Sequence, residues 1–411
     1  MKRTLGVFDA VVIGLGSMIG AGIFAALGPA AAAAGSGLLI GLALAAVVAY
    51  CNATSSARLA ALYPQSGGTY VYGRERLGDF WGYTAGWSFI VGKTASCAAM
   101  ALTVGAYVWP QYAHGVAVGA VLALTAVNYA GVQKSALLTR IIVATVLGVL
   151  AAVVVTLAGA GEADRLSIGA DADAWGVLQA AGLLFFAFAG YARMATLGEE
   201  VVEPRRTLPR AIFIALGIVL VLYASVAVLL ISTLGVNRLA LSTTPLADVL
   251  APAWTPLVVI IAGIACLGSL VGILAGLSRT SLAMARERDL PGLLARVSPR
   301  TSAPIVAEGL IATLAVVIVV LLEPAHLVAA SSAAVLLYYA VAHLSALRQP
   351  PAERWQPRAV AIAGLVGCVV LVAALPPLSI LGTACLLAVG LVLRMLAVRL
   401  RARSAPEAVA R

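Results

Sequence analysis

The chain has 411 residues, of which 62% are hydrophobic and only 11% are charged. Soluble domains carry roughly 25% charged residues, so the composition excludes a soluble globular protein and predicts an integral membrane protein. The net charge of +10 could indicate a nucleic acid partner, but the placement of the basic residues gives it another explanation.

Apolar segments of membrane-spanning length follow one another along the whole chain. A helix needs about 20 apolar residues to cross a bilayer. The sequence offers twelve such segments, and they begin near Val7, Gly37, Asp79, Gly115, Leu137, Trp175, Pro209, Pro256, Pro304, Ala325, Ala359 and Leu378. We therefore expect an all-α integral membrane protein with twelve transmembrane spans and no soluble domain.

The basic residues are unevenly divided between the two sides of such a bundle. All but four of the 27 lie on the side that holds the N-terminus. The exceptions are Arg165 and Arg238, on the opposite side, and Lys93 and Arg193, within spans. Because basic loops stay in the cytoplasm, we expect a multi-pass protein of the cytoplasmic membrane with both termini inside. The positive charge then requires no nucleic acid partner.

Two spans are interrupted by glycine-centred sequences in matching places. The first interruption is 16–22 (Gly-Ser-Met-Ile-Gly-Ala-Gly) in span 1, and the second is 188–192 (Phe-Ala-Gly-Tyr-Ala) in span 6. Hydrocarbon offers no hydrogen bonds, so non-helical backbone at that depth is stable only where it lines a cavity. Glycines can instead serve helix packing alone, but the pairing of the breaks favours a transporter with its substrate near the midplane.

Residues for catalysis or metal binding are scattered in this sequence. The five cysteines all lie within spans and lack the spacing of metal ligands, and the three histidines are far apart, two of them at span ends. A channel would need a continuous polar lining, which these apolar spans lack. We expect no enzymatic activity, no catalytic residue, no metal and no cofactor.

Four motifs occur in an order and spacing that resemble the amino acid–polyamine–organocation (APC) transporters. They are 16–24 (GSMIGAGIF), 64–72 (PQSGGTYVY), 199–212 (EEVVEPRRTLPRAI) and 283–291 (AMARERDLP). The resemblance implies a LeuT-type fold, with five spans in 1–159, five in an inverted repeat in 160–347, and two further helices in 348–411. It also implies that the substrate is an amino acid.

The first break supplies the expected carboxylate site. Gly20, Ala21 and Gly22 lack bulk, so backbone can approach a ligand, and amides at a half-helix N-terminus suit an α-carboxylate. The substrate-binding residues expected here are Ser17, Met18, Ile19, Gly20, Ala21 and Gly22.

For the second break, the APC resemblance implies that Tyr191 closes over the substrate from the outside and that Phe188 and Gly190 line the site. The carbonyls of Phe188 and Ala189 are expected to meet the substrate's ammonium group. Many family members carry an acidic residue after the aromatic, but this chain has Ala192. That departure argues against a cationic substrate.

A lysine in span 3 replaces a lysine that proton-coupled APC members often carry in span 5. Val146 stands at the matching position, whereas Lys93 lies near the middle of span 3. A buried ammonium costs at least ~2.5 kcal/mol on insertion scales, so Lys93 should face a cavity, find a partner or lose its proton. We expect Lys93 to carry the coupling proton and count Cys97 of the same span among the binding residues. Arg193 lies close enough to the end of span 6 to snorkel.

Sodium coupling remains an alternative, since the APC fold implies a cation site between the span 1 break and span 8. The residues expected there are Ser17, Gly268 and Ser269. The preferred interpretation is a secondary active transporter for an amino acid with a neutral or acidic side chain, coupled to protons. The alternatives are a sodium-coupled, exchange-type or exporting carrier of the same fold, and a non-transporting sensor or partner subunit.

Overall fold

The computed structural model describes residues 3–65, 67–129, 136–169, 171–298 and 304–404. Within these ranges the chain is helical, apart from loops and one isolated bridge between Leu5 and Val201. The elements of the first half are α1 (Val7–Met18), α2 (Ala21–Ala25), α3 (Leu27–Ala34), η1 (Gly35–Gly37), α4 (Leu38–Leu62), α5 (Thr69–Leu77), α6 (Asp79–Val108), η2 (Pro110–Tyr112), α7 (Ala113–Tyr129) and α8 (Ala136–Thr156).

The second half of the chain likewise consists of long helices separated by short turns and short helices. They are η3 (Ala163–Leu166), α9 (Ala174–Phe188), η4 (Ala189–Tyr191), α10 (Ala192–Ala195), α11 (Pro204–Leu234), α12 (Val236–Leu241), α13 (Pro245–Asp248), α14 (Thr255–Arg286), η5 (Gly292–Ala295), α15 (Ile305–Leu321), α16 (Pro324–Leu347), η6 (Pro351–Glu353), α17 (Arg358–Ala374) and α18 (Pro377–Ser404).

Ten helical segments of the described chain are long and apolar enough to cross a membrane. Two shorter apolar helices, α15 and α17, have 17 residues each. The expected spans correspond in order to these twelve segments, except that α3, expected at the end of span 1, is joined to α4 in the segment Leu27–Leu62. Span 1 is thus formed by α1 and α2, and span 6 by α9, η4 and α10. The protein is therefore an all-α membrane protein, and the count of twelve spans stays a prediction because α15 and α17 fall short of the usual length.

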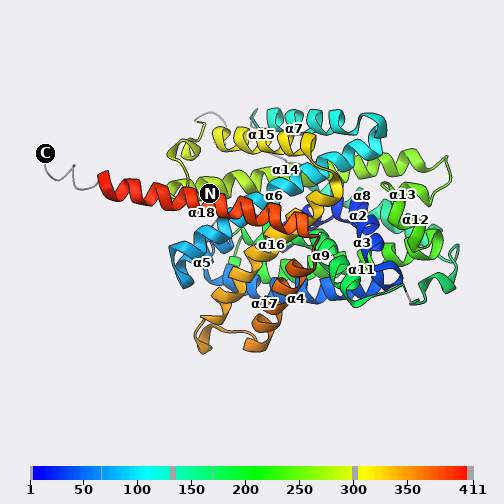
Figure 1. Cartoon of the computed structure of the whole chain (residues 1–411), viewed down its shortest axis with the longest axis horizontal. Helices are drawn as coiled ribbons and strands as arrows, with labels where there is room; N and C mark the ends of the chain where they lie inside the picture. The colour runs from blue at the N-terminus through cyan, green and yellow to red at the C-terminus, as the bar shows by residue number, and fades with distance from the viewer. Residues whose placement is uncertain (1–2, 66, 130–135, 170, 299–303, 405–411) are drawn as a thin grey trace.

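The central helices are α6, α9 and α16, with α7 and α15 along one edge and α4 and α17 along the opposite edge (Figure 1). The thirty residues of α6 would span about 45 Å at the usual rise. Small residues let it approach α16 closely, since a Cβ on Gly92 would lie 2.8 Å from Val335.

Peripheral helices expose apolar side chains instead of burying them. Leu386, Val389 and Leu393 of α18 are each at least half exposed, and Val366 and Val369 of α17 are similarly open. A soluble surface would not carry such a belt, whereas hydrocarbon solvates it. The outer faces therefore suit lipid, and a small number of polar side chains, Lys93 and His343 among them, are buried inside the bundle.

Candidate functional site

The span 1 break is a true departure from the helix. The first helix ends at Met18, Ile19 has ψ 74°, and Gly20 has φ −137° and ψ −136° before α2 begins at Ala21. A Cβ on Gly20 would lie 2.6 Å from Ser269 Oγ of α14, and one on Gly22 would lie 2.6 Å from Ala187 Cα of α9. The glycines are thus needed because neighbouring helices approach the backbone.

The span 6 break is a tightening of the helix. Residues Ala189–Tyr191 form the single 3₁₀ turn η4, and their neighbours keep right-handed helical angles. A Cβ on Gly190 would collide with the carbonyl of Ser17. The two breaks predicted from the sequence therefore lie against each other, although the second contains no unwound residue.

Tyr223 of α11 bridges the two breaks, and sequence reasoning missed it. Its hydroxyl lies 2.6 Å from the Met18 carbonyl oxygen and 3.1 Å from that of Ala187. Its ring packs edge-on against Phe188 at 5.3 Å between centroids. The signal available in the sequence was a lone tyrosine inside an apolar run, because a buried hydroxyl needs a partner.

Lys93 of α6 is 4% exposed, and its Nζ donates a hydrogen bond of 3.0 Å to the carbonyl of Ala189. This carbonyl was expected to meet the substrate's ammonium group, but here the protein's own lysine takes that place. No carboxylate forms an ion pair with Lys93 among the residues that the structure describes. Cys97, one turn further along α6, is fully buried beside it. Lys93 therefore binds directly to the first residue of η4.

The three residues expected at the cation site contact different neighbours. Ser269 Oγ donates to the carbonyl of Gly16 and lies 3.5 Å from that of Ile19, so it faces the span 1 break. Ser17 donates to its own helix at the Ile13 carbonyl, 2.9 Å away, as lone serines in spans commonly do. A Cβ on Gly268 would face Ile142 of α8 at 3.5 Å.

The other expected residues surround this meeting point. Met18 and Ile19 are buried at the end of α1, and Met18 packs against Gly190. Ala21 begins α2, and its side chain lies outside the described part of the structure. Val146 of α8 is buried and apolar, so no charge replaces the missing span 5 lysine at that position.

Tyr191 packs onto Tyr339 of α16. Its ring is fully buried, 5.1 Å from that of Tyr339, which in turn lies 5.9 Å from Phe185. Arg193, two residues on, donates to Thr196 at 2.8 Å and lies against Gly276 of α14. Tyr339 had no signal in the sequence, since one more tyrosine in span 10 looks like an ordinary packing residue.

The family motifs outside the spans meet at one end of the bundle, where α5 lies (Figure 1). Arg74 donates to the Tyr70 hydroxyl at 2.9 Å and pairs with Asp289 at 3.2 Å, and Arg394 of α18 also binds Asp289. Burial, and then the Asp289 carboxylate, raise the pKa of the Tyr70 phenol, so it stays a protonated donor to that carboxylate. Ser66 of the second motif lies outside the described residues.

This arrangement, a helical membrane bundle with two interrupted spans in contact, defines a class of membrane transporter. The family model described as amino acid permease matches residues 5–393, and the chain belongs to that family. An uncharacterised transporter of Mycobacterium tuberculosis is 61% identical over 396 residues, which cover 95% of this chain and 90% of the relative.

More distant relatives are named for different transported substrates. A branched-chain amino acid permease of Bacillus subtilis is 28% identical over 350 residues, covering 77% of this chain and 74% of the relative. A methylthioribose transporter of the same organism is 29% identical over 338 residues, covering 74% and 72%. The family thus makes the protein a transporter rather than an enzyme, while the cargo varies among its relatives.

Proposed function

We propose that the protein carries an amino acid across the cytoplasmic membrane by alternating access, with the substrate at the contact of the two breaks. The observation that carries this proposal is that contact: Gly190 abuts the Ser17 carbonyl, and Gly22 abuts Ala187. Backbone amides at the start of α2, from Ala21 onward, suit the α-carboxylate, because the positive end of a helix favours anions.

The proposed architecture is the LeuT type, with spans 1–5 and 6–10 as inverted repeats, spans 11 and 12 added, and both termini in the cytoplasm. Phe188 and Tyr191 would close the site on the span 6 side. Ala192 offers no carboxylate to a cationic side chain, so we propose a substrate with a neutral or acidic side chain. The name of the branched-chain amino acid permease among the relatives is consistent with a neutral one.

We further propose that Lys93 couples transport to protons. Burial away from water favours the neutral amine, whereas an approaching substrate carboxylate favours the ammonium. Proton and substrate would therefore bind cooperatively. The hydrogen bond from Lys93 to the Ala189 carbonyl supports this role, since a change in the charge of Lys93 is felt directly at η4.

The sodium alternative has one observation in its favour. Ser269 brings its hydroxyl to the carbonyls of Gly16 and Ile19, and oxygen atoms in such a group suit a small cation. In this arrangement the Ser269 hydroxyl already donates its hydrogen to the Gly16 carbonyl. The Ser17 hydroxyl donates to the Ile13 carbonyl. A proton therefore remains the coupling ion that we propose.

Purified protein in liposomes tests the proposal. Radiolabelled amino acids are offered with a proton gradient, a sodium gradient or neither, and accumulation is compared with exchange. The parent should accumulate a neutral or acidic amino acid only with the proton gradient. Lys93→Met, which keeps the apolar stem, should lose accumulation and its pH dependence while retaining exchange. Arg193→Met, the other basic residue within a span, is the matched control and should accumulate like the parent.

Three results would contradict parts of this proposal. Accumulation by Lys93→Met with the parent's pH profile would make Lys93 structural and move the coupling to Ser17 and Ser269. Accumulation driven by sodium alone would establish the sodium alternative. Specific binding of an amino acid with no uptake or exchange under any gradient would instead favour a sensor or partner subunit.

A further inference from the structure

A chain of buried polar side chains joins α4, α16 and α17 beside the span 6 break. His343 of α16 is fully buried, with Nδ1 3.0 Å from Ser55 Oγ and Nε2 2.6 Å from Asn52 Oδ1. Cys368 Sγ of α17 also donates to Asn52 Oδ1, at 3.3 Å. Gly364 faces the imidazole so closely that a Cβ there would collide with it. The helices are therefore shaped around this ring.

The hydrogen bonds define which tautomer a neutral His343 adopts. Asn52 Oδ1 can only accept, so Nε2 carries a hydrogen, and Nδ1 is then free to accept from the Ser55 hydroxyl. Both nitrogens of the neutral ring are thus paired. Burial also disfavours the charged ring. The same contacts also accommodate a charged ring, in which Nδ1 donates to Ser55 Oγ.

The chain reaches the same turn, η4, that Lys93 contacts. Asn52 lies beside Tyr191, the last residue of η4, while Lys93 donates to Ala189, the first residue of the same turn. Asn52 Nδ2 and the hydroxyls of Tyr191 and Tyr339 are buried next to one another. Two groups that can gain or lose a proton therefore act on one three-residue turn.

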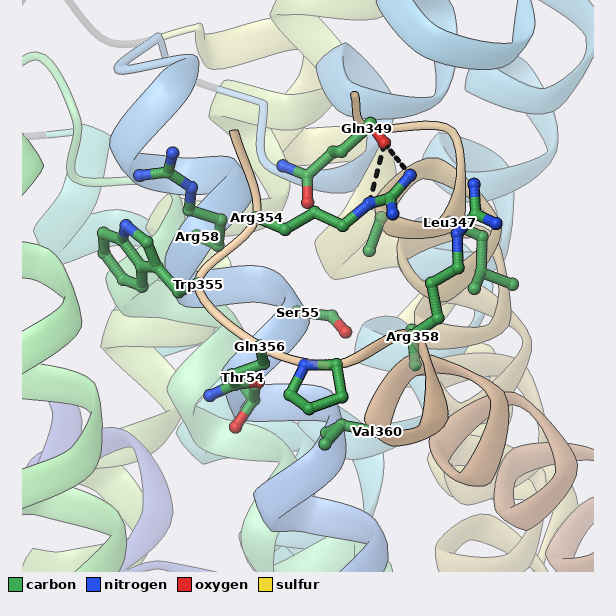
Figure 2. Close-up of a pocket in the computed structure, with 13 residues that line it drawn as sticks. Thr54, Ser55, Arg58, Leu347, Gln349, Arg354, Trp355, Gln356, Arg358 and Val360 are labelled. Atoms are coloured by element: carbon green, nitrogen blue, oxygen red, sulfur yellow. Dashed lines mark hydrogen bonds between the residues drawn. The ribbon is translucent and has the colours of Figure 1, made fainter. Parts of the chain in front are cut away.

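A pocket at the end of the bundle gives the imidazole a route to water. It lies between α4, the end of α16 and the loop that leads to α17, and Ser55 is one of the residues that line it (Figure 2). Ser55 Oγ can take a proton from the pocket while its own hydrogen passes to Nδ1, so that one proton moves and the hydroxyl is regenerated. The reverse steps return it to the pocket.

The charges around this route favour release of the proton. Arg58 stacks on Trp355, and Arg354 donates to the Gln349 carbonyl. The titratable and charged groups that face His343 and the pocket are Cys51, Cys368, Tyr191, Tyr339, Arg58, Arg354, Arg358 and Glu353, which pairs with Arg76. The arginines outnumber the one carboxylate, so they oppose an imidazolium nearby.

We propose that His343 is a second proton-binding site of the transport cycle, which exchanges its proton with the pocket through Ser55 and acts on the span 6 break through Asn52 and Tyr191. The proposal rests on the proton-coupled function proposed above. A proton on His343 strengthens the bond to Asn52 Oδ1 and so fixes the amide with Nδ2 toward Tyr191. Loss of the proton leaves the amide easier to turn.

The chain has three histidines, which makes a direct test possible. Full-length protein with isotope-labelled histidine gives three imidazole signals in nuclear magnetic resonance, assigned with His343→Gln, His114→Gln and His326→Gln. We expect the His343 signal to change from the neutral to the protonated form on acidification in the presence of saturating amino acid. Ser55→Ala should slow the gain and loss of the proton at His343 and leave the signals of His114 and His326 unchanged.

Transport measurements then show whether this proton matters. His343→Gln can still donate and accept hydrogen bonds but cannot titrate, so it should lose one ionisation step from the pH profile of uptake while keeping exchange. His114, which bonds to the Val319 carbonyl away from the pocket, is the matched control, and His114→Gln should keep the parent's profile. In a Lys93→Met background, His343→Gln should remove whatever pH dependence of exchange remains.

The two proposals fail in different ways. If the parent shows no uptake, or uptake without pH dependence, the proposed proton-coupled function is wrong whatever His343 does. If the parent is proton-coupled but His343 stays neutral throughout the pH range, or His343→Gln keeps the parent's pH profile, His343 is a packing residue. Should His343→Gln fail to fold, the imidazole signal of the parent decides alone.

Discussion

At the span 1 break the backbone leaves the helix at Ile19 and Gly20, whereas at the span 6 break it stays helical and only tightens through Ala189–Tyr191. The first break is fixed by steric fit, because neighbouring helices leave no room for a side chain at Gly20 or Gly22. The second is contacted by Lys93, at Ala189, and by the aromatic Tyr339, at Tyr191.

This difference indicates which break can respond to a proton. A glycine contact with backbone carries no charge, so the span 1 break should keep its shape at any pH. The span 6 break depends on a side chain whose charge changes when a proton binds. We infer that span 1 supplies a fixed seat for the carboxylate and that span 6 moves with the coupling ion.

The strongest test of the fixed seat is Gly22→Leu. A Cβ at this position would lie 2.6 Å from the backbone of Ala187, which cannot rotate away as a side chain could. We expect substrate binding and uptake to fall below detection, because the two breaks are forced apart. Thermal shift with the transported amino acid and uptake into liposomes measure both effects.

The control for this variant is Gly217→Leu on α11, where a Cβ would meet nothing within 4 Å. It should bind and transport like the parent, and size-exclusion chromatography should show both variants folded. Normal uptake by Gly22→Leu would remove the first break from the substrate site.

An intermediate effect is expected from Tyr191→Ala, which tests the span 6 break. The ring is fully buried against Tyr339, and removing a buried aromatic ring costs about 3–5 kcal/mol of stability. Substrate binding should weaken because η4 loses its support from α16. Titration of binding at a temperature well below the lowered Tm measures this.

Tyr191→Phe separates the ring from the hydroxyl. The ring and its packing on Tyr339 are kept, so the phenylalanine variant should bind substrate nearly as the parent does and lose only the contact with Asn52. Tyr112→Ala, on an exposed ring, controls for loss of a tyrosine as such. If Tyr191→Ala binds and transports like the parent, the closing role implied for Tyr191 by the family resemblance does not apply here.

The sequence was sufficient to predict what depends on local composition. Long apolar runs give the helices, and Gly20 and Gly22 mark the first break because only glycine allows such close backbone contact. The positions of both breaks follow from the same reasoning. The 3₁₀ form of the second does not, since Phe188 and Ala189 can also continue an ordinary helix.

Contacts between distant residues could not be read from the chain. Lys93 clearly needed a partner, but its partner is a backbone carbonyl 96 residues away, and every residue has a carbonyl. His343 seemed isolated among apolar residues, yet Asn52 and Ser55 of α4 reach both of its nitrogens. Such pairs depend on how the helices pack, which no periodicity of the sequence records.

The smallest effect is expected from Tyr223→Phe, which probes the link between the two breaks. The ring and its packing on Phe188 are kept, and only the hydroxyl between the carbonyls of Met18 and Ala187 is lost. A hydrogen bond of this kind contributes about 1 kcal/mol net, or roughly a fivefold change in Kd if the link is formed only with substrate bound. Tyr50→Phe, on an exposed tyrosine of α4, is the control. A lower Tm with an unchanged Kd would mean that Tyr223 joins the breaks equally with and without substrate. If neither quantity changes, the contact of the two breaks depends on the glycines alone.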